Sequence, residues 1–315
     1  MRSRILYLGA FTLAVTALVI AASASQTGSG HASNLPADIE DGEPVQAAPH
    51  QKRHLFTQTV LHRKVGNQMQ ATGIKLDEQT FEVVASVSNL GGYDWVHVVN
   101  RAKNIDGWIF EHLTSAVPAM QVPANGVFPI GQERVDRWAA LPHNYKPSDL
   151  VNLDMQYCRI RQIQMRREAA EAFVRLHKAA RQAGHSIFGF SGYRSYDMQR
   201  QLYLNRITIG ELHRQRYVAR PGHTEHQLGT VVDVVGLNTG NAAMHSFDNT
   251  PEANWLRTNC YEYGFVLSYG PDNRIPTGYG YESWHIRYIG KAAVAEWIRK
   301  HLPPGHAVAR RYAAR

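Results

Sequence analysis

Cysteine is scarce in this sequence, with only Cys158 and Cys260 among 315 residues. So few thiols exclude a cysteine-rich zinc finger, an iron–sulfur protein and a disulfide-dense miniprotein. Charged residues make up only 19% of the chain, and 34 Lys and Arg against 26 Asp and Glu leave a mild net charge of +8. Hydrophobic residues reach 44%, which is ordinary for a globular protein and too high for wholesale disorder. The 16 histidines leave a histidine-based metal site open.

Only the N-terminus contains a long uncharged hydrophobic run, at residues 5–22. The run follows Arg2 and Arg4, and small residues at 22 and 24 give the pattern of a cleavage site. These features predict that residues 1–24 are a cleaved signal peptide. Because the run is also near the minimum length of a membrane span, an uncleaved membrane anchor is the alternative. In both cases we expect the rest of the chain outside the cytoplasm, in the periplasm or cell wall.

Composition suggests three poorly structured segments. Residues 25–54 are rich in Gly, Ser, Ala and Pro without any period, which predicts a linker. Several prolines and glycines at 118–135 predict a second linker. Residues 303–315 begin with Pro-Pro-Gly and carry three arginines, so we expect a loose basic tail. Export would let Cys158 and Cys260 form a disulfide, and two buried thiols are the alternative.

Residues 55–117 contain short strand-like segments separated by close turns. Residues 81–87 alternate in part between apolar and polar side chains, and later apolar runs follow Gly-Gly and Asp-Gly turns. The pattern predicts a small all-β barrel. Residues 94–98 and 107–113 resemble the end of bacterial Src-homology-3-like (SH3-like) domains, which implies cell-wall or peptide binding. The alternative is that the tryptophans in these two segments are simply core.

The pattern changes to helices and strands in residues 136–302. An amphipathic helix is predicted at 166–183, and a short buried strand follows at 187–190. Ser195 is a credible N-cap of a second helix, and residues 231–235 read as another strand. We therefore expect an α+β domain, with a small antiparallel sheet flanked by helices.

Asp233 is the most informative residue, because it stands in the middle of a β-branched run. An unpaired buried carboxylate would be strongly destabilising, so a cation, an arginine or a metal must lie beside it. His226 precedes it in the sequence, and His285 belongs to another unusual cluster further on. Two histidines and one carboxylate suit zinc with one position left for water. On a regular strand Glu282 and His285 would face opposite sides, so both can face one site only if the chain bends between them.

The motif T-x-H-x-x-G-x-V-x-D at residues 224–233, followed by E-x-W-H at 282–285, resembles the VanY-type D-alanyl-D-alanine carboxypeptidase family. These are zinc peptidases related to lysostaphin and hedgehog domains. The segments at 191–199 and 263–267 fit the same family in the same order. The resemblance runs over about residues 145–290.

This resemblance implies a role for each matching residue. His226, Asp233 and His285 would be the zinc ligands. Glu282 would be the general base that takes a proton from the water at the zinc and passes it to the leaving amine. Arg194 would stabilise the oxyanion that forms at the scissile carbonyl.

Two further residues, Gln199 and Thr224, would touch the terminal part of the substrate. Thr224 stands where the family usually has serine, which keeps the hydroxyl. Val231 stands where alanine is usual, which adds bulk beside a metal ligand without removing chemistry. His223 is left as a structural or surface residue.

The sequence therefore predicts an exported zinc-dependent carboxypeptidase that removes the terminal D-alanine from peptidoglycan stem peptides. An endopeptidase with the same zinc centre and a non-enzymatic cell-wall-binding sensor are the alternatives. The basic stretch from Arg287 to the C-terminus could hold anionic wall polymers or serve only solubility. We expect no nucleic-acid partner, because the chain is predicted to be exported and has no recognised binding motif.

Overall fold

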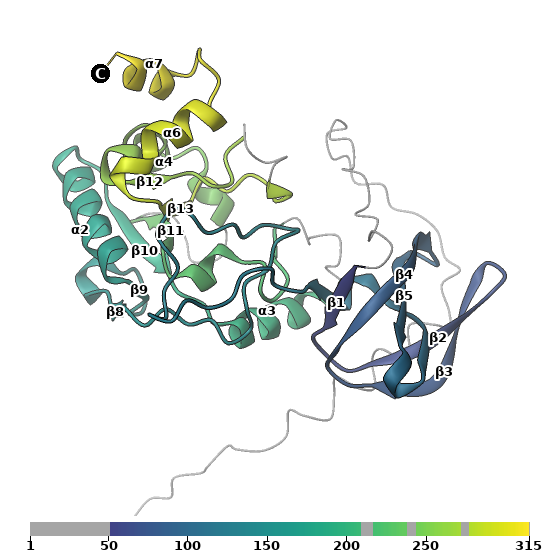
Figure 1. Cartoon of the computed structure of the whole chain (residues 1–315). Helices are drawn as coiled ribbons and strands as arrows, with labels where there is room; N and C mark the ends of the chain where they lie inside the picture. The colour runs from purple at the N-terminus through teal and green to yellow at the C-terminus, as the bar shows by residue number, and fades with distance from the viewer. Residues whose placement is uncertain (1–50, 209–216, 238–243, 272–276, 315) are drawn as a thin grey trace, which may run out of the picture.

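The computed structural model describes residues 51–208, 217–237, 244–271 and 277–314 (Figure 1). These residues form an all-β module at the N-terminal end and a larger domain of mixed helices and strands. The predicted signal peptide and most of the linker predicted at 25–54 lie outside the described residues. Among the described helices, none has both the length and the hydropathy needed to cross a membrane.

The N-terminal β-module consists of antiparallel strands with two short 3₁₀ turns between them. In chain order its elements are β1 (Lys52–Leu55), β2 (Thr59–Val65), β3 (Gln68–Leu76), β4 (Gln79–Leu90), β5 (Tyr93–Asn100), η1 (Arg101–Lys103), β6 (Ile105–Phe110), η2 (Glu111–Leu113) and β7 (Thr114–Ala116). Because side chains alternate along a strand, each central strand sends one set inward. Phe81, Val83, Val96, Val98 and Ile109 are buried in the core that results.

The sheet of the β-module is open. Its strand order is β3-β2-β6-β5-β4-β1-β7, and no pairing between the edge strands β3 and β7 is present among the described residues. The predicted strands are confirmed in β4, β5 and β6, but the predicted barrel is not. Alternation along one strand indicates a half-buried position, whereas closure depends on tilt and stagger across all strands. The resemblance to SH3-like domains stays a prediction.

Residues 117–149 connect the two parts without regular secondary structure. They include the linker predicted at 118–135, yet much of this segment is packed against the larger domain. Phe128 and Val135 form a buried apolar cluster with Leu141, Tyr145 and Leu228, the last of which belongs to the larger domain. Prolines and glycines prevent a regular helix or strand here, but they do not prevent burial.

The larger domain carries a four-stranded antiparallel sheet in the order β10-β11-β13-β12, with helices packed around it (Figure 1). In chain order its elements are β8 (Leu150–Asn152), η3 (Met155–Tyr157), β9 (Gln164–Arg166), α2 (Arg167–Gln182), β10 (Ile187–Ser191), α3 (Tyr196–Thr208), η5 (Glu225–Leu228), β11 (Val231–Gly236), η6 (Met244–Phe247), α4 (Pro251–Asn259), η7 (Cys260–Tyr263), β12 (Phe265–Val266), β13 (His285–Tyr288), α6 (Lys291–His301) and α7 (Ala307–Ala313). The expected combination of helices and strands is confirmed.

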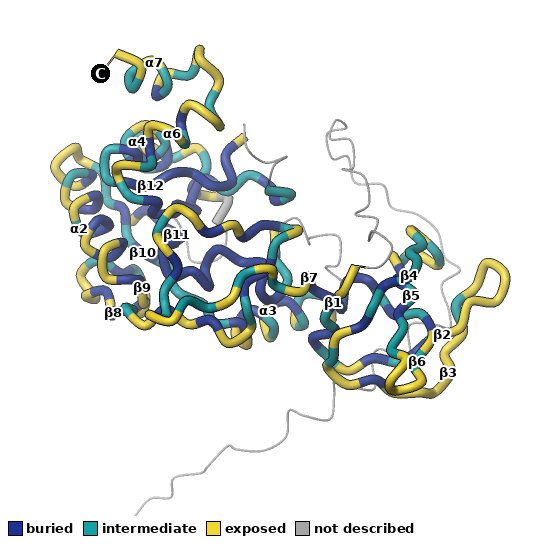
Figure 2. Tube along the Cα trace, viewed as in Figure 1, coloured by how far each residue is buried: buried dark blue, intermediate teal, exposed yellow. Residues whose placement is uncertain are grey.

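Helix α2 follows the amphipathic pattern of its sequence. Phe173, Leu176 and Ala180 lie on one face and are fully buried against the sheet, whereas the opposite face is exposed (Figure 2). Gly184 follows the helix with a φ of +85°, a conformation that glycine adopts without strain. Ser195 caps α3 as expected, because its Oγ accepts a hydrogen bond from the N–H of Met198 at 3.2 Å.

The C-terminal segment is partly helical. Residues 303–315 contain helix α7 instead of only a loose tail, because its alanine-rich sequence favours a helix and Val308 is buried against the domain. Cys158 and Cys260 are both buried free thiols. The structure therefore has two buried thiols and no disulfide between Cys158 and Cys260.

Candidate active site

The four-stranded sheet brings the three predicted metal ligands together. Asp233 lies in the middle of β11 and stands directly opposite His285, the first residue of β13. His226 lies in η5, just before β11. All three residues are buried, and one ligand atom from each lies within 4.8 Å of the others. The cluster is a candidate metal site made of two imidazoles and one carboxylate.

The short turn η5 explains two residues of the sequence motif. The Thr224 hydroxyl caps the turn by accepting a hydrogen bond from the N–H of His226 at 3.3 Å. Gly229 ends it with a φ of +73°. A Cβ at Gly229 would also lie 2.9 Å from a methyl carbon of Leu150. The hydroxyl and the glycine therefore shape the backbone that aims His226 at Asp233.

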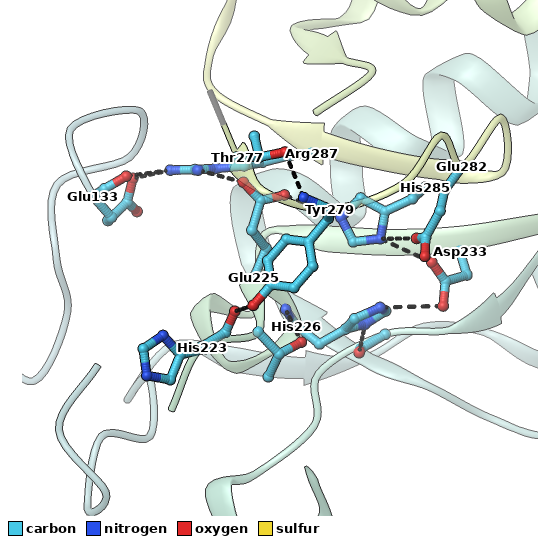
Figure 3. Close-up of polar contacts among 12 residues, drawn as sticks. Glu133, His223, Glu225, His226, Asp233, Thr277, Tyr279, Glu282, His285 and Arg287 are labelled. Atoms are coloured by element: carbon cyan, nitrogen blue, oxygen red, sulfur yellow. Dashed lines mark hydrogen bonds and ion pairs between the residues drawn. The ribbon is translucent and has the colours of Figure 1, made fainter. Parts of the chain in front are cut away.

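Each histidine of the cluster has one ring nitrogen engaged away from the cluster (Figure 3). Nδ1 of His226 donates to the carbonyl of Gly192 at 2.7 Å, which leaves Nε2 facing Asp233 at 3.1 Å. Nε2 of His285 lies 3.0 Å from Oε2 of Glu225, which leaves Nδ1 facing Asp233 at 3.1 Å. Such outer partners select the tautomer that a metal-binding histidine needs. The donor atoms therefore fit a divalent cation.

The charges of the cluster favour a cation. Burial by itself would lower the pKa of His285, but Asp233 and Glu225 raise it to about 10. Burial opposes ionisation of Asp233, yet the two histidines hold its pKa well below the usual range. Two carboxylates around one imidazole thus attract a positive charge to this position, and a bound metal ion would supply it.

Glu282 reaches the same site through the bend that the family resemblance implies. Residues 282–284 precede β13 and form a turn in which the N–H of His285 donates to the carbonyl of Glu282 at 3.3 Å. The turn brings Oε2 of Glu282 to 3.7 Å from Nδ1 of His285 (Figure 3). Burial raises the pKa of Glu282 to about 8, so this carboxyl can exchange a proton near neutral pH.

Arg194 approaches the cluster from the loop between β10 and α3. The backbone N–H of Arg194 donates to the carbonyl of His226 at 3.1 Å. The charge of its side chain lowers the pKa of both His226 and Glu282. Its guanidinium is held by Oε1 of Gln199 at 2.7 Å and by Oγ of Ser191 at 3.1 Å. Gln199 is 1% exposed. In the structure Gln199 therefore orients Arg194, and Thr224 caps η5. Contact of Gln199 and Thr224 with the substrate stays a prediction.

A buried ionic network behind His285 was not anticipated from the sequence. Glu225 accepts from Arg287 at 2.7 Å, and Arg287 also contacts Glu133 at 3.1 Å (Figure 3). Burial opposes ionisation of Glu225, but Arg287 and His285 lower its pKa to about 2. The one sequence feature that points to a role for Glu225 is its position between Thr224 and His226 of the motif. Arg287 is thus a buried partner of two carboxylates instead of part of a basic surface.

We expect Glu225→Gln to weaken metal binding by about 10- to 100-fold, the usual effect of removing an outer partner of a metal ligand. The amide keeps the shape but removes the negative charge that holds the Nε2 proton of His285. Competition with a chromogenic chelator, using zinc as the probe, measures the dissociation constant. Glu296→Gln, which alters an exposed ion pair with Lys300, is the control. Equal zinc affinity in both variants would show that Glu225 does not position His285.

Comparison with known proteins shows which family this site resembles. Residues 162–291 match the family model described as VanY, D-alanyl-D-alanine carboxypeptidase. The chain is 39% identical over 163 residues to a putative carboxypeptidase, YodJ, of Bacillus subtilis, which covers 50% of this chain and 60% of that protein. It is 32% identical over 171 residues to a D-alanyl-D-alanine carboxypeptidase of Enterococcus faecium, and this match covers 53% of this chain and 50% of that protein.

A solved structure of a vancomycin resistance D,D-pentapeptidase, VanY, in complex with Zn(II) is also similar. It is 24% identical, covers 58% of this chain and 98% of that chain, and has a TM-score of 0.43. The chain spans 60% of the length of the Bacillus subtilis relative and 50% of the length of the Enterococcus faecium relative. The match of the family model contains His226, Asp233, Glu282 and His285 in one segment. The similarity to the VanY D-alanyl-D-alanine carboxypeptidase family therefore extends over residues 162–291 and includes the candidate metal site.

Proposed function

We propose that this protein is a zinc-dependent D-alanyl-D-alanine carboxypeptidase that removes the terminal D-alanine from peptidoglycan stem peptides. One observation carries the proposal. The buried cluster of His226, Asp233 and His285 lies beside Glu282, a carboxyl whose pKa is raised to about 8. The family match over residues 162–291 and the names of the relatives support the substrate class.

Zinc suits this donor set best among common divalent metals. Imidazole nitrogens and a single carboxylate are typical zinc ligands, and three protein ligands leave a position open, as in catalytic zinc sites. Magnesium and calcium prefer sites made of oxygen atoms alone. When bound, zinc would act as a Lewis acid that polarises the scissile carbonyl and activates water.

The residues around the ligands supply the proton transfer and the charge stabilisation. Glu282 would take a proton from the attacking water and deliver it to the leaving D-alanine amine. Its burial and raised pKa suit a group that must accept and release a proton in one cycle. Arg194 would stabilise the negative charge that develops on the scissile carbonyl oxygen, and Gln199 holds the guanidinium for that task.

The terminal carboxylate of the substrate separates a carboxypeptidase from an endopeptidase. We expect amidation of a peptide ending in D-Ala-D-Ala to reduce kcat/KM by about tenfold or more, because a charge-assisted hydrogen bond is lost. Paired kinetics on the free acid and the amide, with product masses, measure this effect. Release of alanine from the free acid alone supports the proposal. Equal rates, or release of a di- or tripeptide, would favour an endopeptidase with the same zinc centre.

A sensor without catalytic activity is the remaining alternative, and it predicts binding without turnover in the same assay. The presence of Glu282 and Arg194 beside all three ligands argues against it. We also propose that the protein acts outside the cytoplasm, since residues 1–24 have the pattern of an export signal and the proposed substrate belongs to the cell wall.

A further inference from the structure

We propose that the β-module is a built-in support of the active site, in which Glu111 positions Arg194 through Arg220 and Gln199. Glu111 and Arg220 would thus be positioning residues that do not touch the substrate. The kinetic part of the test below rests on the proposed carboxypeptidase function, whereas its hydrogen-exchange part does not.

The support begins with an ionic cluster at the junction of the two parts. Oε2 of Glu111 lies 2.5 Å from one terminal nitrogen of Arg220, and Oε1 accepts from the other at 2.7 Å. Oε1 of Glu111 also lies 2.8 Å from Arg53 of β1. The side chains of Glu111 and Arg53 are 10% and 6% exposed, and that of Arg220 is 13% exposed. A carboxylate of the β-module therefore holds an arginine of the larger domain in a bidentate, water-shielded pair.

Strand β7 fixes the same segment at two further points. The carbonyl of Thr114 accepts a further hydrogen bond from Arg220 at 3.2 Å. The N–H of Ala116 donates to Nε2 of His223 at 3.1 Å, while Nδ1 of His223 donates to the carbonyl of Asp136 at 2.8 Å. Burial lowers the pKa of His223 to about 4, so this histidine stays neutral and serves as both acceptor and donor. All three residues of β7 are buried (Figure 2).

The anchored segment leads directly to Arg194. Ala219, next to Arg220 in the chain, offers its carbonyl to Nε2 of Gln199 at 2.5 Å. Oε1 of Gln199 then accepts from the guanidinium of Arg194 at 2.7 Å. Each bond in this series joins buried or half-buried groups, so a shift of the backbone around residue 220 would be transmitted to the guanidinium. The same segment continues into Thr224 and the η5 turn.

A second, more exposed ion pair crosses the same junction. Arg200 of α3 pairs with Glu78 of the β-module and donates to the carbonyl of Phe56. The side chain of Glu78 is 46% exposed, and that of Arg200 is 29% exposed. Arg200 adjoins Gln199 in the chain, but its partner Glu78 is much more exposed than Glu111, so this pair should hold the junction only weakly. Glu78→Gln is therefore a matched control, since it removes an exposed carboxylate at the same junction, whereas Glu111→Gln removes a buried one.

The experiment compares Glu111→Gln with Glu78→Gln in the full-length protein loaded with zinc. For Glu111→Gln we expect kcat to fall by about 10- to 100-fold, the scale of a small misplacement of a catalytic group, with little change in KM and unchanged zinc content. For Glu78→Gln we expect kcat within about twofold of the unmodified protein. Hydrogen–deuterium exchange should quicken in residues 217–228 only in Glu111→Gln.

A double-mutant cycle with Gln199→Met tests the route. If the effect of Glu111 passes through Gln199, adding Glu111→Gln to Gln199→Met should lower kcat no further. Equal kcat and equal exchange in the Glu111 and Glu78 variants would overturn the proposal. If Glu111→Gln fails to fold, Arg220→Lys keeps the positive charge without the bidentate geometry, and the same measurements decide. An inactive unmodified protein that still shows the exchange difference would refute the proposed function alone.

Discussion

Replacing His226 with alanine is expected to abolish both metal binding and peptidase activity. The wild-type protein should contain about one zinc ion per chain, held by three protein ligands. The variant would keep Asp233 and His285 but lose the Nε2 donor and the hydrogen bond from Nδ1 to the carbonyl of Gly192. Two remaining donors do not make a tetrahedral site with one open position, so zinc content should fall close to zero. Elemental analysis of the purified protein, together with D-alanine release, measures both effects.

The control for this variant is His185→Ala, which removes a half-buried histidine just after α2. Its zinc content and D-alanine release should match those of the wild type. Restoring zinc to a chelated wild-type protein should restore activity, whereas adding zinc to His226→Ala should not. A metal-free wild type with full activity would contradict the metallopeptidase assignment, and a His226→Ala protein that retains one zinc ion would contradict the ligand set.

Glu282→Gln should separate catalysis from metal binding. We expect the variant to keep its fold and its zinc while kcat falls by roughly 10²–10⁴-fold, the contribution of a general base. Glutamine has nearly the same shape as glutamate, but its amide cannot accept a proton from water. The carboxyl is buried and lies 3.7 Å from Nδ1 of His285, and Asp233, which lies nearer to that nitrogen at 3.1 Å, is a candidate metal ligand.

Glu171→Gln, on the exposed face of α2, is the matched control for charge removal. Zinc content and kcat should be measured on the same preparations of both variants. If Glu282→Gln lost its zinc as completely as His226→Ala, Glu282 would be a ligand and its assignment as the base would be wrong. If kcat were unchanged with zinc retained, another group would have to transfer the proton.

The candidate ligands and base follow from the family resemblance, and Asp233 also stands out by its local sequence. Asp233 interrupts a β-branched run, and a buried carboxylate implies a positive partner wherever it occurs. The bend before His285 follows from the family resemblance alone, because that resemblance places Glu282 and His285 at one site, which a regular strand does not allow. The structure contains that bend as a turn ahead of β13.

The outer partners could not be predicted in the same way. Arg287 opens the basic C-terminal stretch of the sequence, yet it is buried between Glu225 and Glu133. Glu133 lies within a segment whose prolines and glycines predicted a linker. Charge and composition report what a residue is, whereas burial depends on which distant segments pack over it. Arg287 and Glu133 are 154 positions apart in the chain.

The sequence by itself predicted the amphipathic helix α2 and the strands β10 and β11, because periodicity and local residue choice act over a few positions, while its resemblance to a family implied the ligand and base residues. Only the tertiary structure decided that the β-module is an open sheet docked on the larger domain and that Glu111 meets Arg220. Such contacts join residues far apart in the chain, and their energy arises from burial and geometry that no local pattern encodes.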